Sequence, residues 1–160
     1  MKKDLVNLMR LLSLAVVLAF TATAVTSAQS DKPDFSGTWA LNTIKSSPAA
    51  ANSSGSLVVK QEGDLLTTKA PGEDGMTVVT KYRLDGKESI NMSEGIESKS
   101  HAKFSSDGKS LTILSKSMVD GKEKTDEDVW SFIDSKTLSI VCTTVGTSGD
   151  EVTKYVYERK

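Results

Sequence analysis

The sequence predicts an all-β domain, an antiparallel up-and-down meander of about ten strands that closes into a barrel. Turn-forming pairs such as Asp85-Gly86 and Asp120-Gly121 recur along the chain. Glycine supplies the positive φ that tight turns need, and aspartate tolerates it. The runs between these turns are rich in Val, Ile, Thr, Tyr and Phe, which is typical of strands joined by hairpins. After the N-terminal segment no stretch shows the periodicity of an amphipathic helix.

The first 28 residues have the layout of a signal peptide. Lys2 and Lys3 supply positive charge, residues 11–25 are almost free of polar side chains, and residues 26–28 are small. The apolar run is shorter than the ~20 residues that a membrane-spanning helix needs. We expect cleavage after Ala28 and a single mature domain, residues 29–160, that is periplasmic or secreted. An uncleaved anchor helix is the alternative.

Ten strands are expected in the mature domain, each between two turn signals. They cover residues 35–42, 56–61, 65–70, 76–84, 87–93, 96–105, 109–116, 121–133, 136–145 and 150–158. Consecutive hairpins make an antiparallel meander, and a sheet this wide exposes two unpaired edges unless it closes on itself. A barrel is therefore favoured, and a two-layer sandwich is the structural alternative.

The segment between the first two strands differs from the rest of the domain. Residues 43–55 are small, polar and turn-prone, with no apolar stripe. They predict a long loop with one short helical turn around residues 48–51. The sequence is compatible with a cover over one mouth of the barrel and with a disordered connection.

Alternation along the strands assigns an inner face that mixes apolar side chains with hydroxyl groups. On residues 96–105, for example, Ser98 and Ser100 share a face with Phe104. Such a face suits a barrel that holds water or a small ligand, or a narrow filled barrel whose hydroxyl groups bond to the backbone. If a ligand binds, the expected lining is Trp39, Leu41, Val78, Tyr82, Ser98, Ser100, Phe104, Ile113, Ile140, Tyr155 and Tyr157.

The composition argues against several classes of function. The whole chain has 20 basic and 21 acidic residues; the predicted signal peptide holds three and one of them, which leaves 17 and 20 and a net charge of −3. Such an interspersed, mildly acidic surface does not favour nucleic acid. His101 is the only histidine, on a charged face, and Cys142 is the only cysteine, expected to be a small buried hydrophobe. We therefore expect no cofactor, no metal, no lipid anchor and no catalytic residues.

The strand at residues 121–133 has a face whose direction the sequence leaves open. Trp130 and Phe132 alternate there with charged residues. If the face is inward, which we favour, the two aromatic residues are core; if it is outward, they mark a protein-binding surface. We interpret Asp126 and Asp128 as part of a solvated charge run rather than as a catalytic acid pair.

Residues 35–41 read FSGTWAL, and this pattern resembles the opening strand of the calycin group, which contains the lipocalins and the fatty-acid-binding proteins. Residues 120–123, 134–138 and 153–158 resemble the last three strands of a fatty-acid-binding protein. The chain also resembles small exported bacterial lipocalin-like proteins. The resemblance implies a lipocalin-like barrel in which Gly37 allows close backbone approach and Trp39 plugs the closed end.

The resemblance does not extend to the ligand. Fatty-acid-binding proteins hold the ligand carboxylate with an arginine on the strand that matches residues 121–133 and with an Arg-x-Tyr motif on the last strand. Here the first position offers Asp126, Glu127 and Asp128, and of the second motif only Tyr157 matches. A fatty-acid carboxylate buried without a cationic partner is costly. The resemblance therefore implies the shape and not the fatty-acid ligand.

Together these observations predict a non-catalytic exported barrel that binds a small, largely apolar, neutral molecule. The alternative is a protein-interaction barrel of the cell envelope, such as an inhibitor or a stress factor, with a filled core and no ligand. Neither nucleic acid nor stable membrane insertion after signal cleavage is expected.

Overall fold

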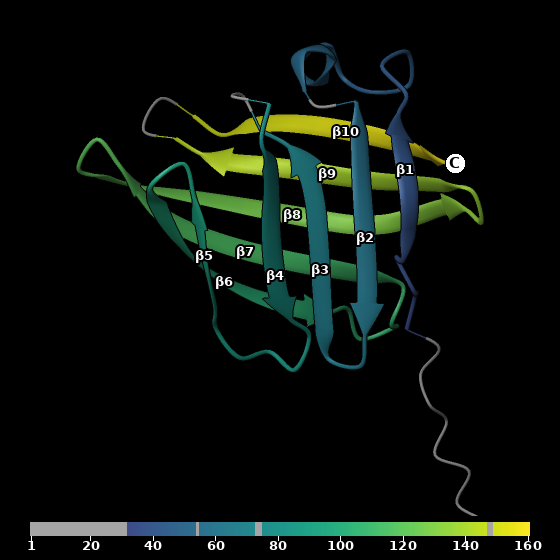
Figure 1. Ribbon diagram of the computed structural model, residues 1–160, viewed down its shortest axis with the longest axis horizontal. Coiled ribbons are helices and arrows are strands. Elements are labelled where there is room, and N and C mark those ends of the chain that lie inside the picture. The colour runs from purple at the N-terminus through teal and green to yellow at the C-terminus, as the bar shows by residue number, and fades with distance from the viewer. Residues whose placement is uncertain (1–31, 54, 73–74, 147–148) are drawn as a thin grey trace, which may run out of the picture.

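Ten antiparallel strands form one sheet that curls into a nearly closed barrel (Figure 1). A computed structural model describes residues 32–53, 55–72, 75–146 and 149–160, so the predicted signal peptide lies outside the described residues. The elements are β1 (Gly37–Leu41), η1 (Pro48–Asn52), β2 (Ser56–Glu62), β3 (Leu65–Pro71), β4 (Thr77–Arg83), β5 (Ser89–Ser93), β6 (Ile96–Phe104), β7 (Ser110–Val119), β8 (Lys122–Asp134), β9 (Thr137–Val145) and β10 (Glu151–Arg159). Within the described ranges, no helix has the length and hydropathy to cross a bilayer.

The strand order confirms the predicted meander. The sheet runs β4-β3-β2-β1-β10-β9-β8-β7-β6-β5, and β1 pairs with β10 so that Trp39 faces Arg159 across the ladder. This pairing joins the two ends of the described chain into one continuous sheet, which rules out the two-layer sandwich. All ten strands lie close to their predicted positions; the largest difference is β7, which continues to Val119 because it pairs with β8 as far as the turn.

Two hairpins show why the turn signals located the strands so well. Glu94 and Gly95 connect β5 to β6 with φ angles of 52° and 80°, and Asp120 and Gly121 connect β7 to β8 with 51° and 73°. Two consecutive residues with positive φ form the tight turn whose twist matches that of paired strands. Each turn therefore fixes the register of its hairpin and, with it, which side chains point inward.

The barrel is interrupted between β4 and β5, where side chains replace the backbone ladder. Asn91 on β5 accepts a hydrogen bond from the Lys81 N–H through Oδ1 (2.8 Å) and donates one to the Lys81 carbonyl through Nδ2 (3.0 Å). Ser89 Oγ accepts a third bond, from the Arg83 N–H (2.8 Å). The Asn91 amide thus takes the place of a peptide group of a neighbouring strand. We call this junction the seam.

Aromatic side chains fill one end of the barrel. The Phe35 ring lies 5.7 Å from Trp130 and 5.1 Å from Phe132, centroid to centroid, and Trp39 lies 5.8 Å from Phe132. Trp39 is completely buried, and its indole Nε1 donates to the Phe35 carbonyl (3.1 Å). Trp130 is also buried, so this face of β8 points inward, as favoured from the sequence. The expected plug at the closed end is confirmed.

Gly37 leaves space for the Arg159 side chain to pack over the aromatic plug. A Cβ atom at Gly37 would lie 2.5 Å from the Arg159 guanidinium. Without it, the guanidinium lies 4.2 Å from the centre of the Trp39 ring system and Nη1 donates to the Ser36 carbonyl (2.7 Å). A cation over an indole face is a favourable contact. A glycine is therefore needed at this position of the FSGTWAL pattern because a side chain would displace the Arg159 guanidinium from Trp39.

The described part of the loop between β1 and β2 is held against β10. Its 3₁₀ turn η1 lies next to β10, where β1 ends and β2 begins (Figure 1). The Ser47 N–H donates to the Lys154 carbonyl (2.9 Å), and Ser46 Oγ accepts from the Val156 N–H (2.9 Å). Ala50 is fully buried. These contacts favour the cover over a barrel mouth that was one of the two interpretations of this segment.

Candidate ligand-binding site

A polar pocket of about 440 Å³ opens inside the barrel, in the half away from the aromatic plug. Its lining comes from η1 and from the inner faces of β4 and β6 to β10. It consists of Ala49, Tyr82, Ser98, Ser115, Ser117, Lys124, Asp126, Asp128, Cys142, Thr144, Glu151, Thr153 and Tyr155.

The register of β8 places charged residues in this pocket. Side chains two residues apart share a face, so the face that buries Trp130 also carries Asp128, Asp126 and Lys124. Across the ladder Asp128 faces Cys142, and Asp126 faces Thr144. The interpretation of Asp126 and Asp128 as a solvated charge run is therefore wrong. The inward aromatic residues also remove the observation that favoured a protein-binding surface on β8.

Asp126 has both a cationic partner and a hydrogen-bond donor. Lys124 Nζ lies 3.0 Å from its carboxylate, and Thr144 Oγ1 donates to it at 2.5 Å. The charge and at least part of the hydrogen-bonding capacity of this carboxylate are thus met by the protein itself.

Asp128 lies in a different environment. Burial raises its pKa above the ordinary value of an aspartate, and the nearby Asp126 carboxylate acts in the same direction. The Cys142 thiol, within hydrogen-bonding reach, and the more remote charge of Lys124 oppose this rise. Among the described residues no cation lies within ion-pair distance of Asp128. It is therefore the one pocket carboxylate on β8 without a counter-charge.

Cys142 differs from its expected role. It is only partly buried, and it lines the polar pocket beside Asp128 instead of packing as a small hydrophobe, because its position on β9 faces Asp128 across the ladder. Burial and the Asp128 carboxylate raise the pKa of its thiol to about 12. The thiol therefore stays protonated at neutral pH and is a poor nucleophile.

Phenol groups supply the apolar part of the pocket wall. Burial raises the pKa of Tyr82, which lines the pocket, and burial together with nearby Tyr155 raises the pKa of Tyr157, a core residue beside it, to about 12. The rings of Tyr155 and Tyr157 stack with their centroids 6.5 Å apart. Neutral phenols offer both a ring face and a hydroxyl group to a bound molecule.

Several inner hydroxyl groups form hydrogen bonds with one another. Ser100 Oγ lies 2.9 Å from Ser115 Oγ, and Thr68 bonds to Thr80. These hydroxyl groups pair with other side chains rather than with the backbone expected for a filled barrel, and Ser115 also lines the pocket, so hydroxyl pairing and a pocket occur together.

The residues predicted to line a ligand site all lie on inner strand positions but are divided between pocket and core. Tyr82, Ser98 and Tyr155 line the pocket. Val78 is half-buried on β4, and the others pack in or beside the core or pair there, namely Trp39, Leu41, Ser100, Phe104, Ile113, Ile140 and Tyr157. Their role as ligand contacts stays a prediction. The acidic residues of β8 were missed, although the two-residue spacing from Trp130 would have placed them inward.

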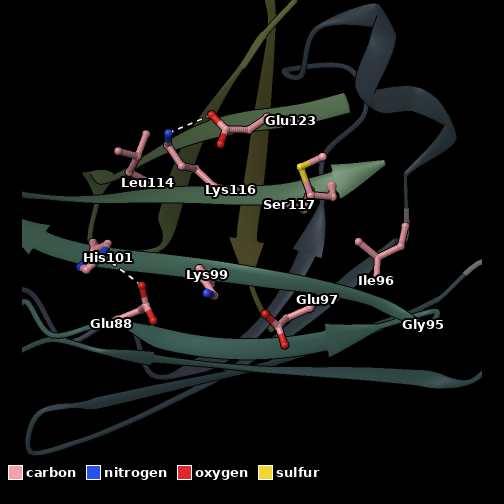
Figure 2. A pocket seen from close by; sticks show the side chains of 11 residues that line it. Glu88, Gly95, Ile96, Glu97, Lys99, His101, Leu114, Lys116, Ser117 and Glu123 are labelled. Atoms are coloured by element: carbon pink, nitrogen blue, oxygen red, sulfur yellow. Dashed lines mark hydrogen bonds and ion pairs between the residues drawn. The ribbon is translucent and has the colours of Figure 1, made fainter. Parts of the chain in front are cut away.

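A second hollow, of about 530 Å³, lies mainly over the outer faces of β6 and β7 (Figure 2). Two contacts join polar side chains of its lining: Lys116 Nζ lies 2.9 Å from Glu123, and His101 Nε2 lies 3.7 Å from Glu88. Leu114 and Met118 are exposed beside them. Exposed ion pairs of this kind are weak, and the exposed His101 agrees with the charged outer face predicted for it. Across the described ranges, no cluster of three His, Cys, Asp or Glu residues is close enough to hold a metal ion.

Comparisons with known proteins identify the fold. No protein-family model matches the sequence, and no curated protein shows significant sequence similarity to it. Zebrafish ileal bile acid-binding protein, solved with cholic acid, superposes with a TM-score of 0.56 at 20% identity over 79% of this chain and 98% of its own. An abundant heat soluble (SAHS) protein of Ramazzottius varieornatus superposes with a TM-score of 0.56 at 13% identity over 79% of this chain and 95% of its own. The ten-stranded meander, the aromatic plug at one end and these two structural likenesses show that the chain has the fold of a calycin-like β-barrel.

Proposed function

We propose that the protein is an exported, non-catalytic barrel that binds a small molecule in the polar pocket. The observation that carries this proposal is the pocket itself, a partly open space of about 440 Å³ lined by inward-facing polar groups and phenol rings. Small-molecule sites have this size and this mixture of apolar wall and placed polar groups. The zebrafish barrel with a similar fold is one that was solved with cholic acid.

The pocket wall indicates the general character of the ligand. Tyr82 and Tyr155 present ring surface, whereas Ser98, Ser117 and Thr153 present hydroxyl groups. A molecule with an apolar body and at least one polar group satisfies both kinds of surface. A ligand without polar groups would leave the pocket hydroxyl and carboxyl groups without partners, which costs free energy.

Binding is tested by filling the pocket. Thr153→Trp places an indole in the pocket, because Thr153 is buried in its lining. The adjacent Val152 points outward and is exposed, so Val152→Trp is the matched control. Native mass spectrometry of protein purified from its own host should show a small-molecule adduct on the wild type and on the control, and at least tenfold less adduct on Thr153→Trp. An adduct of equal occupancy on a folded Thr153→Trp protein contradicts the assignment of the pocket.

Export is tested separately. The layout of residues 1–28 supports removal of a signal peptide. The intact mass and N-terminal sequence of the mature protein should place the first residue at Gln29, in a periplasmic or culture fraction. A cytoplasmic protein that retains Met1 contradicts this part of the proposal.

A further inference from the structure

The pocket charges do not balance. Its lining contains one basic residue, Lys124, and three acidic residues, Asp126, Asp128 and Glu151. Lys124 and Asp126 form an ion pair at 3.0 Å. Glu151 is exposed at the start of β10, where water solvates it. Asp128 is the remaining charge: it lies deeper on β8, between Ile113 and Cys142 on the neighbouring strands, and no described cation pairs with it.

The indole N–H of Trp130, on the same face of β8, also lacks a partner in the described part of the chain. The Trp130 side chain is buried, and its indole Nε1 has no hydrogen-bond acceptor among the described residues. Nearly all buried donors and acceptors in folded proteins are satisfied. Two successive inward positions of β8 thus carry polar groups that the described ranges complement only in part: Asp128 has the Cys142 thiol within hydrogen-bonding reach but no counter-charge, and Trp130 Nε1 has no acceptor. Asp128 is the one that lines the pocket.

We propose that the pocket binds a molecule with a cationic nitrogen, such as an alkylammonium or a guanidinium, on an apolar body, and that Asp128 is the residue that pairs with this cation. The inference rests on the proposed function and specifies the ligand class of that site. A cation at Asp128 would form a charge-assisted hydrogen bond in a site partly shielded from water, where such bonds are strong.

The remaining pocket groups suit the same ligand class. Tyr82 and Tyr155 offer ring faces, which attract cations as well as apolar groups. No arginine lines the pocket, and its single lysine is already paired with Asp126. An anionic ligand would therefore meet uncompensated negative charge, so the preference is opposite in sign to that of a fatty-acid carrier.

Three probes with the same carbon chain separate charge from apolar binding. Octylammonium chloride, octanol and sodium octanoate are titrated into the mature protein, residues 29–160, by isothermal titration calorimetry at pH 7. Octylammonium should bind at least tenfold more tightly than octanol, and octanoate should bind most weakly. Asp128→Asn should lower the octylammonium affinity at least tenfold and change the octanol affinity less than twofold.

Glu127→Gln is the matched control, since Glu127 is the neighbouring acidic residue of β8 and is exposed on the outer face. It removes the same charge and should leave all three affinities unchanged. If octylammonium binds no better than octanol, or if Asp128→Asn keeps the full preference, the cation proposal is overturned while binding by the barrel stands. If no probe binds and the native protein carries no adduct, both the proposed function and this inference fail.

Discussion

The seam between β4 and β5 makes a quantitative prediction about barrel stability. Asn91→Ala removes two hydrogen bonds, the 2.8 Å bond from the Lys81 N–H and the 3.0 Å bond to the Lys81 carbonyl. Asn91 is buried, 7% exposed, so water reaches this junction poorly in the native state. A hydrogen bond contributes a net ~0.5–1.5 kcal/mol. The two bonds together predict a loss of about 2 kcal/mol in the free energy of unfolding.

The seam can be resolved bond by bond. Ser89→Ala removes only the bond from the Arg83 N–H, so about 1 kcal/mol should be lost. Met92→Ala is the control, because Met92 lies on the same strand but is exposed and faces away from the barrel; its effect should stay below about 0.5 kcal/mol.

Thermal unfolding and amide hydrogen exchange together provide the assay. For a domain of this size ~1 kcal/mol corresponds to roughly 4 °C in Tm, which predicts a decrease of about 8 °C for Asn91→Ala and about 4 °C for Ser89→Ala. Exchange protection of the Lys81 amide should fall in the first variant and that of the Arg83 amide in the second. A decrease within about 2 °C of the Met92→Ala value, with Lys81 protection unchanged, would refute the closure of the barrel by these side chains.

Three further predictions concern the inner face. Burial raises the pKa of Asp128, so the native state favours the protonated carboxyl group and ionisation opposes folding. The stability that the protonated form contributes is fully present below the unfolded pKa and is lost as pH rises through the native pKa. Asp128→Asn should therefore be more stable than wild type at pH 7 and lose this advantage near pH 3, which urea unfolding across pH can measure. Because the Cys142 pKa is raised to about 12, Ellman's reagent at pH 8 should label it slowly in the native protein and rapidly in urea; fast native labelling contradicts the assigned environment. Trp39→Ala should cost about 3–5 kcal/mol, measured by urea unfolding, since the fully buried ring fills the closed end; a loss below about 1 kcal/mol contradicts this role.

The sequence allowed the meander and the plug to be predicted because both depend on local signals. Pairs such as Asp120-Gly121 fix tight turns, and each turn fixes the register of its hairpin. The direction of Trp39 follows from the alternation of β1 and from its size. These features require no knowledge of which strands become neighbours across the barrel.

The partners of the pocket charges and the seam could not be predicted in the same way because they depend on neighbours distant in sequence. The inward direction of Asp126 and Asp128 follows from their even spacing from Trp130, but the residues they face, Thr144 and Cys142, lie on β9. Asn91 resembles any polar residue of a strand until β4 is placed beside it, 10 residues away in sequence. Six strands and η1 contribute to the pocket lining and its charged residues come from β8 and β10, so no single segment encodes its charge balance.

The division of β8 into a charged half and an aromatic half has a consequence for how this barrel can change. Asp126 and Asp128 lie in the pocket, whereas Trp130 and Phe132 pack into the plug. Asp126 and Phe132 lie six residues apart on this face, far enough for the effects of substitutions on stability to combine almost independently, whereas Asp128 and Trp130 are adjacent inward positions and should be coupled. The outer end of the pocket can therefore vary in sequence while the aromatic plug keeps the barrel folded.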